Sequence, residues 1–271
     1  MRVLVACEFS GTVRDAFIAY GHDAMSCDLL PADIPGPHYQ GDVRDVLGNG
    51  WDLMIAHPPC TYLSVSGLHW NKRIEGRAAK TEQALDFVRL LMDADIQRIA
   101  IENPVSCIST RIRKPDQIIQ PYQFGHDASK ATCLWLKGLP NLRPTNSVAP
   151  RIVNGRPRWA NQCDSGQNKL APSPDRWRLR SETYAGIARA MASQWGSLKE
   201  GDRWLSQNGC GLFSPATCNP ANVAENLGAP SIGNISPNAN ASVPVTQKTK
   251  VIKLSNVMVE VAFGDAGEKE R

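Results

Sequence analysis

The first half of the chain alternates short apolar runs with segments whose apolar residues recur at helical spacing. The apolar runs predict strands, at 2–7, 23–28, 51–56 and 98–101. The helical spacing predicts two helices, one at 11–20 with Val13, Phe17 and Tyr20 on one face and one at 81–95 with Leu85, Val88, Leu91 and Met92. Strands that alternate with helices imply βαβ units and a mostly parallel sheet. We therefore predict an α/β fold of the Rossmann-like type.

The second half of the chain is less regular. Residues 117–124 and 131–137 predict further strands, and Pro121 places a break or a sheet edge in the first of them. Proline, arginine and asparagine dominate 140–174, which favours an extended loop or a small insert. The helical pattern returns at 182–195 with one apolar stripe, formed by Tyr184, Ile187, Ala188, Met191 and Trp195.

Composition changes sharply beyond Gly196. From Ser206 to Gln247 the only charged residue is Glu225, and such a segment cannot bury enough apolar surface to offset its chain entropy. The run VIKLSNVMVEVAF at 251–263 predicts a strand or a hairpin. We therefore expect four regions, namely a catalytic and cofactor-binding core at 1–139, a basic insert at 140–180, a returning helix at 181–196, and a low-complexity linker with a small appendage at 197–271.

Composition places the chain in the soluble globular class. Hydrophobic residues make up 42% and charged residues 21%, which is ordinary for such proteins. No apolar run approaches the roughly 18 residues that span a bilayer, and the apolar N-terminal segment is too short for a signal peptide. We therefore expect a cytoplasmic protein without membrane contact. The eight cysteines are scattered without a CxxC pair and are expected to be reduced thiols. The five histidines show no metal-ligand spacing, so we expect no metal.

Positive charge is concentrated in one stretch. The net charge is +4, but between Arg143 and Arg180 eight basic residues face two acidic ones, and Trp159 and Trp177 lie among them. This pattern is typical of a surface that contacts nucleic-acid phosphates. A solvated loop with incidental arginines is the alternative.

Two predicted strands each end in a reactive group. The run 51–56 leads into His57-Pro58-Pro59-Cys60, and the run 98–101 leads into Glu102-Asn103-Pro104. Ligands bind at the carboxyl ends of strands in open α/β sheets, so we expect the thiol and the carboxylate to share one site.

The thiol and the carboxylate suit attack on an electron-poor ring. The two prolines fix the loop that carries Cys60, and local positive charge makes a cysteine thiolate available as a nucleophile. A partly buried Glu102 is expected to have a raised pKa and to supply a proton. A structural thiol and a helix cap or surface acid are the alternatives for these residues. No histidine with triad-like support stands out, which weakens a hydrolase interpretation, although His57 lies nearby.

A cofactor loop is predicted before this site. The first strand ends in Phe9-Ser10-Gly11, where a glycine lets the backbone approach a ligand closely. Asp28 ends the second strand and Asp42 lies at a further strand end. Rossmann-like domains place an acid against ribose hydroxyls at such a position, so these three signals in order favour a nucleoside-bearing cofactor.

The order of these motifs resembles that of the DNA cytosine-5 methyltransferase family, over residues 2–196. Phe-Ser-Gly is similar to the family's cofactor loop, HPPCTYLSVSG to its Pro-Cys nucleophile loop, Glu-Asn-Pro to its Glu-Asn-Val signature, and GIARAMASQWG to its C-terminal helix. Compact chains of this kind are similar to proteins carried by phages and prophages.

The resemblance implies a Rossmann-like methyltransferase fold, DNA as partner and S-adenosylmethionine as cofactor. Cys60 would add to carbon 6 of a flipped-out cytosine while Glu102 engages ring nitrogen 3, so that carbon 5 accepts the methyl group. The cofactor-binding residues would be Phe9, Ser10, Gly11, Asp28, Asp42 and Pro58. The substrate-binding residues would be Asn103, Lys130, Arg156, Arg158 and Arg176. We expect a monomer.

The chain departs from the family pattern at three points. Val13 stands where members commonly have a second glycine. The Gln-Arg-x-Arg-like segment is missing, and Ser129-Lys130-Ala131-Thr132 takes its place. A large target-recognition domain is absent, so recognition would depend on 143–180. Two other interpretations therefore stay open, namely methylation of a free pyrimidine nucleotide and DNA binding without catalysis on a methyltransferase scaffold.

Overall fold

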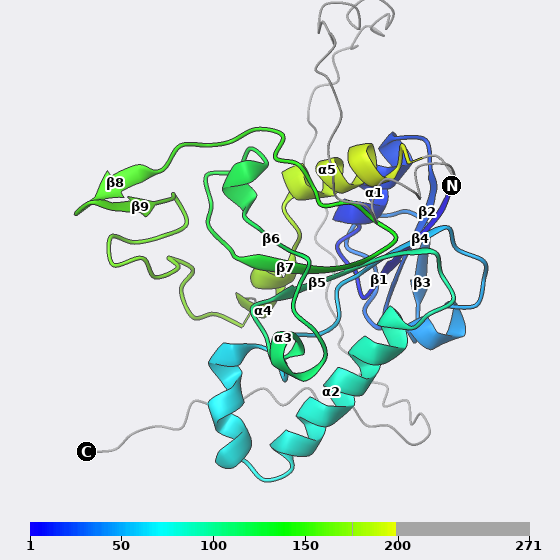
Figure 1. Ribbon diagram of the computed structural model, residues 1–271, viewed down its shortest axis with the longest axis horizontal. Coiled ribbons are helices and arrows are strands. Elements are labelled where there is room, and N and C mark those ends of the chain that lie inside the picture. The colour runs from blue at the N-terminus through cyan, green and yellow to red at the C-terminus, as the bar shows by residue number, and fades with distance from the viewer. Residues whose placement is uncertain (175, 199–271) are drawn as a thin grey trace, which may run out of the picture. The chain divides into compact units, whose positions relative to one another are not determined.

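A central sheet carries the apolar runs of the sequence (Figure 1). The computed structural model describes residues 1–174 and 176–198, all within one compact unit. Apart from residues 197 and 198, the predicted linker and appendage at 197–271 lie outside the described residues. In chain order the helices and strands are β1 (Arg2–Ala6), α1 (Thr12–Ala19), β2 (Asp23–Asp28), β3 (His38–Gln40), β4 (Leu53–Ala56), α2 (Arg77–Met92), β5 (Arg98–Pro104), α3 (Ile108–Arg111), β6 (Gln117–Ile119), β7 (Thr132–Lys137), β8 (Arg151–Val153), β9 (Arg156–Arg158), α4 (Arg176–Ser181) and α5 (Ala185–Trp195). Three 3-10 helices complete them, at Val43–Asp45, Val65–Lys72 and Pro121–Gln123.

The sheet is mostly parallel. Its seven strands lie in the order β3-β2-β1-β4-β5-β7-β6, and β8 and β9 form a separate pair. The first five of these run parallel, whereas β7 is antiparallel to both β5 and β6. The strand order reverses between β1 and β4, and an open α/β sheet binds its ligands at such a point. The predicted fold class is confirmed as a mixed α/β, Rossmann-like fold with a mostly parallel sheet.

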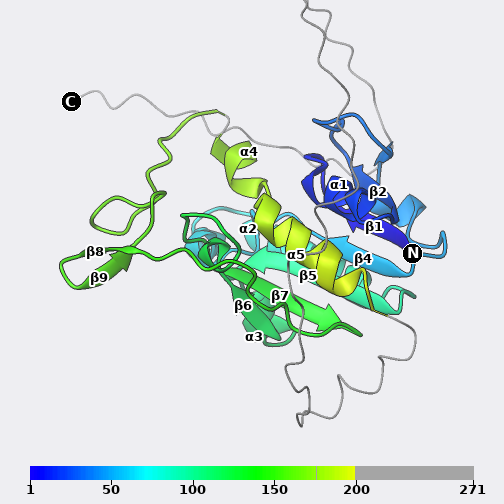
Figure 2. The same ribbon diagram turned by 90° about the horizontal axis from the view of Figure 1, so that it is seen from above.

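Helices cover both faces of the sheet, which is why its inner strands are largely apolar. Val3 and Val5 point to one face and pack in a core with residues of α1 and α5. Leu4 and Ala6 point to the other face and pack with residues of α2. Figures 1 and 2 show α1 and α5 lying together on one side of the sheet and α2 on the other. The carboxyl ends of β1, β2, β4 and β5 therefore meet at one edge.

Several element boundaries differ from the sequence prediction. β5 continues through Pro104 because Glu102, Asn103 and Pro104 pair with β7, so Glu102 lies inside the strand and not after it. Tyr20 is 51% exposed, and its place on the buried helix face is wrong because α1 ends at Ala19. Pro121 does end the strand before it, since a 3-10 helix begins there.

The insert at 140–180 contains more structure than a loop. β8 and β9 form a hairpin joined by Asn154-Gly155, both with positive φ. Asn-Gly is the strongest local signal for a tight hairpin turn, so this element could have been read from the sequence. No helix of residues 1–174 and 176–198 has the length and apolarity that crossing a membrane requires.

Candidate active site

The ends of β4 and β5 bring the predicted thiol and carboxylate to one place. The strands are parallel neighbours with Ala56 opposite Ile101, so His57 and Glu102 follow side by side. The Asn103 side chain is buried, and its Nδ2 donates a 2.8 Å hydrogen bond to the carbonyl of Pro58. Asn103 therefore ties the loop that carries Cys60 to the strand that carries Glu102.

His57 is the immediate partner of Glu102. Its Nδ1 lies 3.0 Å from Glu102 Oε2, and the two side chains are only 13% and 11% exposed. The Thr183 hydroxyl donates to the same oxygen over 3.2 Å. Burial alone raises the pKa of a carboxyl, but the hydrogen bond and charge of His57 outweigh it and lower the pKa of Glu102 to about 2.

The expected raised pKa of Glu102 is therefore wrong, because the sequence did not reveal its partner. Burial likewise lowers the pKa of His57, but the bond to Glu102 and its charge prevail and raise that pKa. The pair thus holds its proton on the imidazole. His57 also has the carboxylate support that the sequence did not indicate for any histidine, yet its Nε2 is buried without a hydrogen bond to Cys60 or to any other described group.

Cys60 is exposed, and at rest it is a neutral thiol. Partial removal from water raises the pKa of the thiol, and the charges of Lys130 and Arg180 lower it without reversing the shift. Local positive charge therefore does not make a thiolate available in this state. Lys130 itself is anchored, because its Nζ donates to the carbonyls of Arg180 at 2.9 Å and Glu182 at 3.4 Å.

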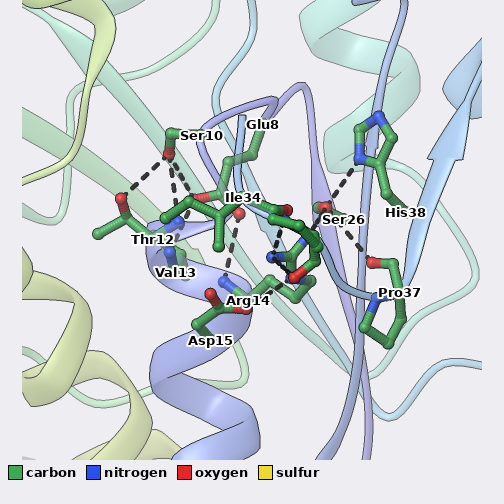
Figure 3. Close-up of polar contacts among 11 residues, drawn as sticks. Glu8, Ser10, Thr12, Val13, Arg14, Asp15, Ser26, Ile34, Pro37 and His38 are labelled. Carbon is green, nitrogen blue, oxygen red and sulfur yellow. Dashed lines mark hydrogen bonds and ion pairs between the residues drawn. The ribbon is translucent and has the colours of Figure 1, made fainter. Parts of the chain in front are cut away.

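The predicted cofactor loop is organised by Glu8, a residue that the sequence analysis did not single out. Cys7 takes a left-handed φ of 58° at the end of β1, which is uncommon outside glycine. Glu8 is buried and accepts hydrogen bonds from the backbone of Val13 at 2.7 Å and Arg14 at 3.2 Å, and from the Ser10 hydroxyl (Figure 3). The protein's own carboxylate thus occupies the N-terminus of α1.

Arg14 holds the chain that follows β2. Its side chain is fully buried, and its guanidinium donates to Ser26 Oγ and to the carbonyls of Ile34 and Pro35 (Figure 3). A Cβ on Gly11 would lie 2.5 Å from this guanidinium, so only glycine fits there. The segment after Asp28 is thereby fastened against the turn between β1 and α1.

The two predicted acids, Asp28 and Asp42, lie at the same edge of the sheet but differ in their hydrogen bonds. Asp28 ends β2, one of its oxygens accepts from the Leu30 amide at 2.9 Å, and burial raises its pKa. Asp42 follows β3 and is already occupied, because it accepts from both the backbone and the side chain of Arg44 at 3.0 Å. Asp28 is therefore the better placed of the two to accept from a ligand hydroxyl.

Phe9 is covered by α4. Its ring lies 5.9 Å from that of Trp177, and the Arg178 guanidinium lies 5.6 Å from the ring centre. Arg178 also pairs with Asp33, whose backbone amide donates to the carbonyl of Phe9 at 2.8 Å. α4, the helix before α5, thus covers the predicted cofactor loop.

Two of the predicted DNA-contacting arginines lie away from the sheet. Arg156 and Arg158 lie on the hairpin, which both views draw apart from the sheet (Figures 1 and 2). Arg158 donates to the carbonyl of Asp164 at 3.0 Å, and Arg176 donates to that of Leu170. Arg180 is the arginine that affects Cys60, and no sequence motif marks it.

Two further observations bear on the chemistry. In the described part of the chain, no group of three or more histidine, cysteine or acidic side chains could hold a metal ion. Its six cysteines, at 7, 27, 60, 107, 133 and 163, are free thiols. Cys210 and Cys218 lie outside the described residues.

Comparisons with known proteins add little. No family model matches the sequence, and no curated protein matches it. Among solved structures, one similar chain is provisionally described as a DNA modification methyltransferase encoded within a prophage, from E. coli. It is 14% identical, the match covers 55% of this chain and 52% of that one, and the TM-score is 0.38. A likeness of this size spans about half of either chain and carries no argument about function.

Proposed function

We propose that this protein is a methyltransferase that transfers the methyl group of S-adenosylmethionine to carbon 5 of cytosine in DNA, through a covalent adduct with Cys60. One observation carries the proposal, namely that Cys60 and the Glu102-Asn103 pair lie on neighbouring strand ends and are joined by the bond from Asn103 to Pro58. A nucleophile and a hydrogen-bonding carboxylate held this way fit addition to a pyrimidine ring.

The cofactor loop favours a cofactor without phosphate groups. A dinucleotide places its pyrophosphate at the N-terminus of the first helix, but here Glu8 already accepts from the amides of Val13 and Arg14. A phosphate would meet that carboxylate and be repelled. The sulfonium and amino groups of S-adenosylmethionine are positive and suit a site that Glu8 and Asp28 line, with Asp28 available to the ribose hydroxyls.

Each residue of the site has a definite task in this reaction. Cys60 loses its proton to water and forms the bond to carbon 6, which directs electron density to carbon 5. Glu102 donates a hydrogen bond to nitrogen 3 of the ring when its carboxyl group carries a proton, and Asn103 holds the nucleophile loop in place through Pro58. When bound, S-adenosylmethionine supplies the electrophilic methyl group. Loss of the proton from carbon 5 and release of Cys60 complete the cycle.

The test begins with expression in a host that lacks DNA methylation, followed by bisulfite sequencing. Purified protein is then incubated with labelled S-adenosylmethionine and either duplex DNA or dCMP. We expect methylation of DNA cytosines by the wild type and its loss in Cys60→Ser, with unchanged cofactor binding by calorimetry. Cys107→Ser is the control for loss of a thiol elsewhere in the fold, since Cys107 is a buried free thiol at the start of α3.

Three outcomes decide between the candidate functions. Wild-type activity in Cys60→Ser would refute the covalent mechanism. Methylation of dCMP without methylation of DNA would favour a nucleotide substrate. Binding of DNA with neither reaction would favour a protein that binds without catalysis.

A further inference from the structure

We propose that His57 is a positioning residue that works through Glu102, holding the carboxylate in place and storing the proton that Glu102 passes to the target base. This inference rests on the proposed function and deepens it. His57 precedes the two prolines of the nucleophile loop, and the place of the missing arginine segment is taken by Ser129-Lys130-Ala131-Thr132.

The bonds at Glu102 leave one of its oxygens available. Both His57 and Thr183 bond to Oε2, at 3.0 Å and 3.2 Å, and no described residue bonds to Oε1. The carboxylate is thus held in place through Oε2, while Oε1 can bind a ligand. Lys130, the only base near the position of the missing arginine, is bonded to two backbone carbonyls and not to Glu102. His57 is therefore the only cationic group of the described residues that bonds to Glu102.

The surroundings of His57 favour the protonated ring. Three acids act on it, Glu102 from β5, Glu8 from the end of β1 and Asp28 from the end of β2, while Lys130 before β7 is the one base that opposes them. An opposite charge favours the charged form of an ionisable group. Nε2 is buried and has no hydrogen-bond partner among residues 1–174 and 176–198, so within this part of the chain the ring can pass its proton only to Glu102.

The proton transfer balances without a further reactant. As the Cys60 thiolate bonds to carbon 6, electron density moves to nitrogen 3. The proton leaves His57 Nδ1 for the Glu102 carboxylate, and the carboxyl group passes it on to nitrogen 3. One N–H bond thus breaks at His57 and one forms on the ring, the carboxylate keeps its charge, the imidazolium becomes neutral and the adduct is neutral. Expulsion of Cys60 returns the proton by the same path in reverse.

The first test is independent of methyl transfer. Histidine ring signals are followed by NMR between pH 5 and 9 in the wild type and in Glu102→Gln. We expect His57 to titrate above the ordinary value of about 6.5 in the wild type and at a lower pH in the variant, because the hydrogen bond to Glu102 and its charge are then lost. A wild-type His57 that titrates at or below the ordinary value would overturn the inference.

The second test compares pH profiles of methyl transfer to duplex DNA in His57→Asn and the wild type. Asparagine can still donate to Glu102 from near the position of Nδ1, but it stores no proton. We expect kcat to fall roughly 100-fold with little change in KM, and the wild-type decline at alkaline pH to disappear. His22→Asn is the matched control, since His22 precedes β2 at the opposite edge of the sheet, and it should behave as wild type.

The outcomes separate this inference from the proposed function. If His57→Asn shows the wild-type rate and pH profile, His57 is structural support alone and the inference is overturned. If the wild type transfers no methyl group, the proposed function fails, and with it the catalytic part of this inference, whatever the titration gives. A normal His57 titration in an active wild type overturns the inference alone.

Discussion

Replacement of Arg14 by methionine should release the segment that follows β2. The guanidinium is fully buried and donates to Ser26 Oγ at 3.2 Å and to the carbonyls of Ile34 at 3.1 Å and Pro35 at 3.4 Å. Methionine fills similar space but donates to none of them. The loss affects both the stability of the fold and the shape of the predicted cofactor loop.

The expected cost follows from what each partner loses. Removing one member of a buried charged network costs about 3–5 kcal/mol, but Ile34 and Pro35 are exposed and their carbonyls can regain water. Only Ser26 is fully buried, and its hydroxyl keeps a 2.8 Å bond to His38. We therefore expect a loss of about 2–4 kcal/mol in the free energy of unfolding. For a domain of this size that lowers Tm by about 4–16 °C.

Urea denaturation and thermal melts measure this loss, and calorimetry with S-adenosylmethionine measures binding. Arg89→Met is the matched control, because Arg89 is only partly buried on α2 and its one ion pair among the described residues is with Asp86. Its free energy of unfolding should change by less than about 0.5 kcal/mol. If the two variants were equally stable and bound the cofactor equally well, the assigned role of Arg14 would be refuted.

Three further predictions concern the site and the insert. The pKa of Glu102 is lowered from 4.5 to about 2. The ionised Glu102 therefore stabilises the folded state fully above pH 4.5, and this stabilisation is lost as the pH falls through 2. Acid titration followed by circular dichroism should show the loss in the wild type and not in Glu102→Gln. Asn103→Ala leaves the Pro58 carbonyl without its donor and should lower the free energy of unfolding by about 1–3 kcal/mol, together with kcat; a variant with wild-type stability in urea would contradict this. If Arg156 and Arg158 contact phosphates, replacing either by glutamine should reduce the slope of log Kd for DNA against log salt concentration by about one unit. Fluorescence anisotropy at several salt concentrations measures this slope. An unchanged slope would mean that the hairpin does not touch DNA.

Much of the fold was accessible from the apolar pattern. Strands buried on both faces are largely apolar, so β1, β4 and the first half of β5 stand out in the sequence. The alternation of strands with helices then predicts their parallel arrangement. The hairpin β8–β9 was missed although Asn154-Gly155 signals it, and β5 was predicted too short because its pairing with β7 depends on a distant segment.

The sequence by itself determined that a thiol and a carboxylate follow two buried strands, and therefore that Cys60 and Glu102 belong to one edge of the sheet. Only the tertiary structure decided how these groups are charged. Forty-five positions separate His57 from Glu102, and the register of β4 against β5 brings them within 3.0 Å. Protonation depends on such distances and on burial, which no local pattern encodes. The same reason explains why Glu8 and Arg14, ordinary charged residues in the sequence, turn out to organise the predicted cofactor loop.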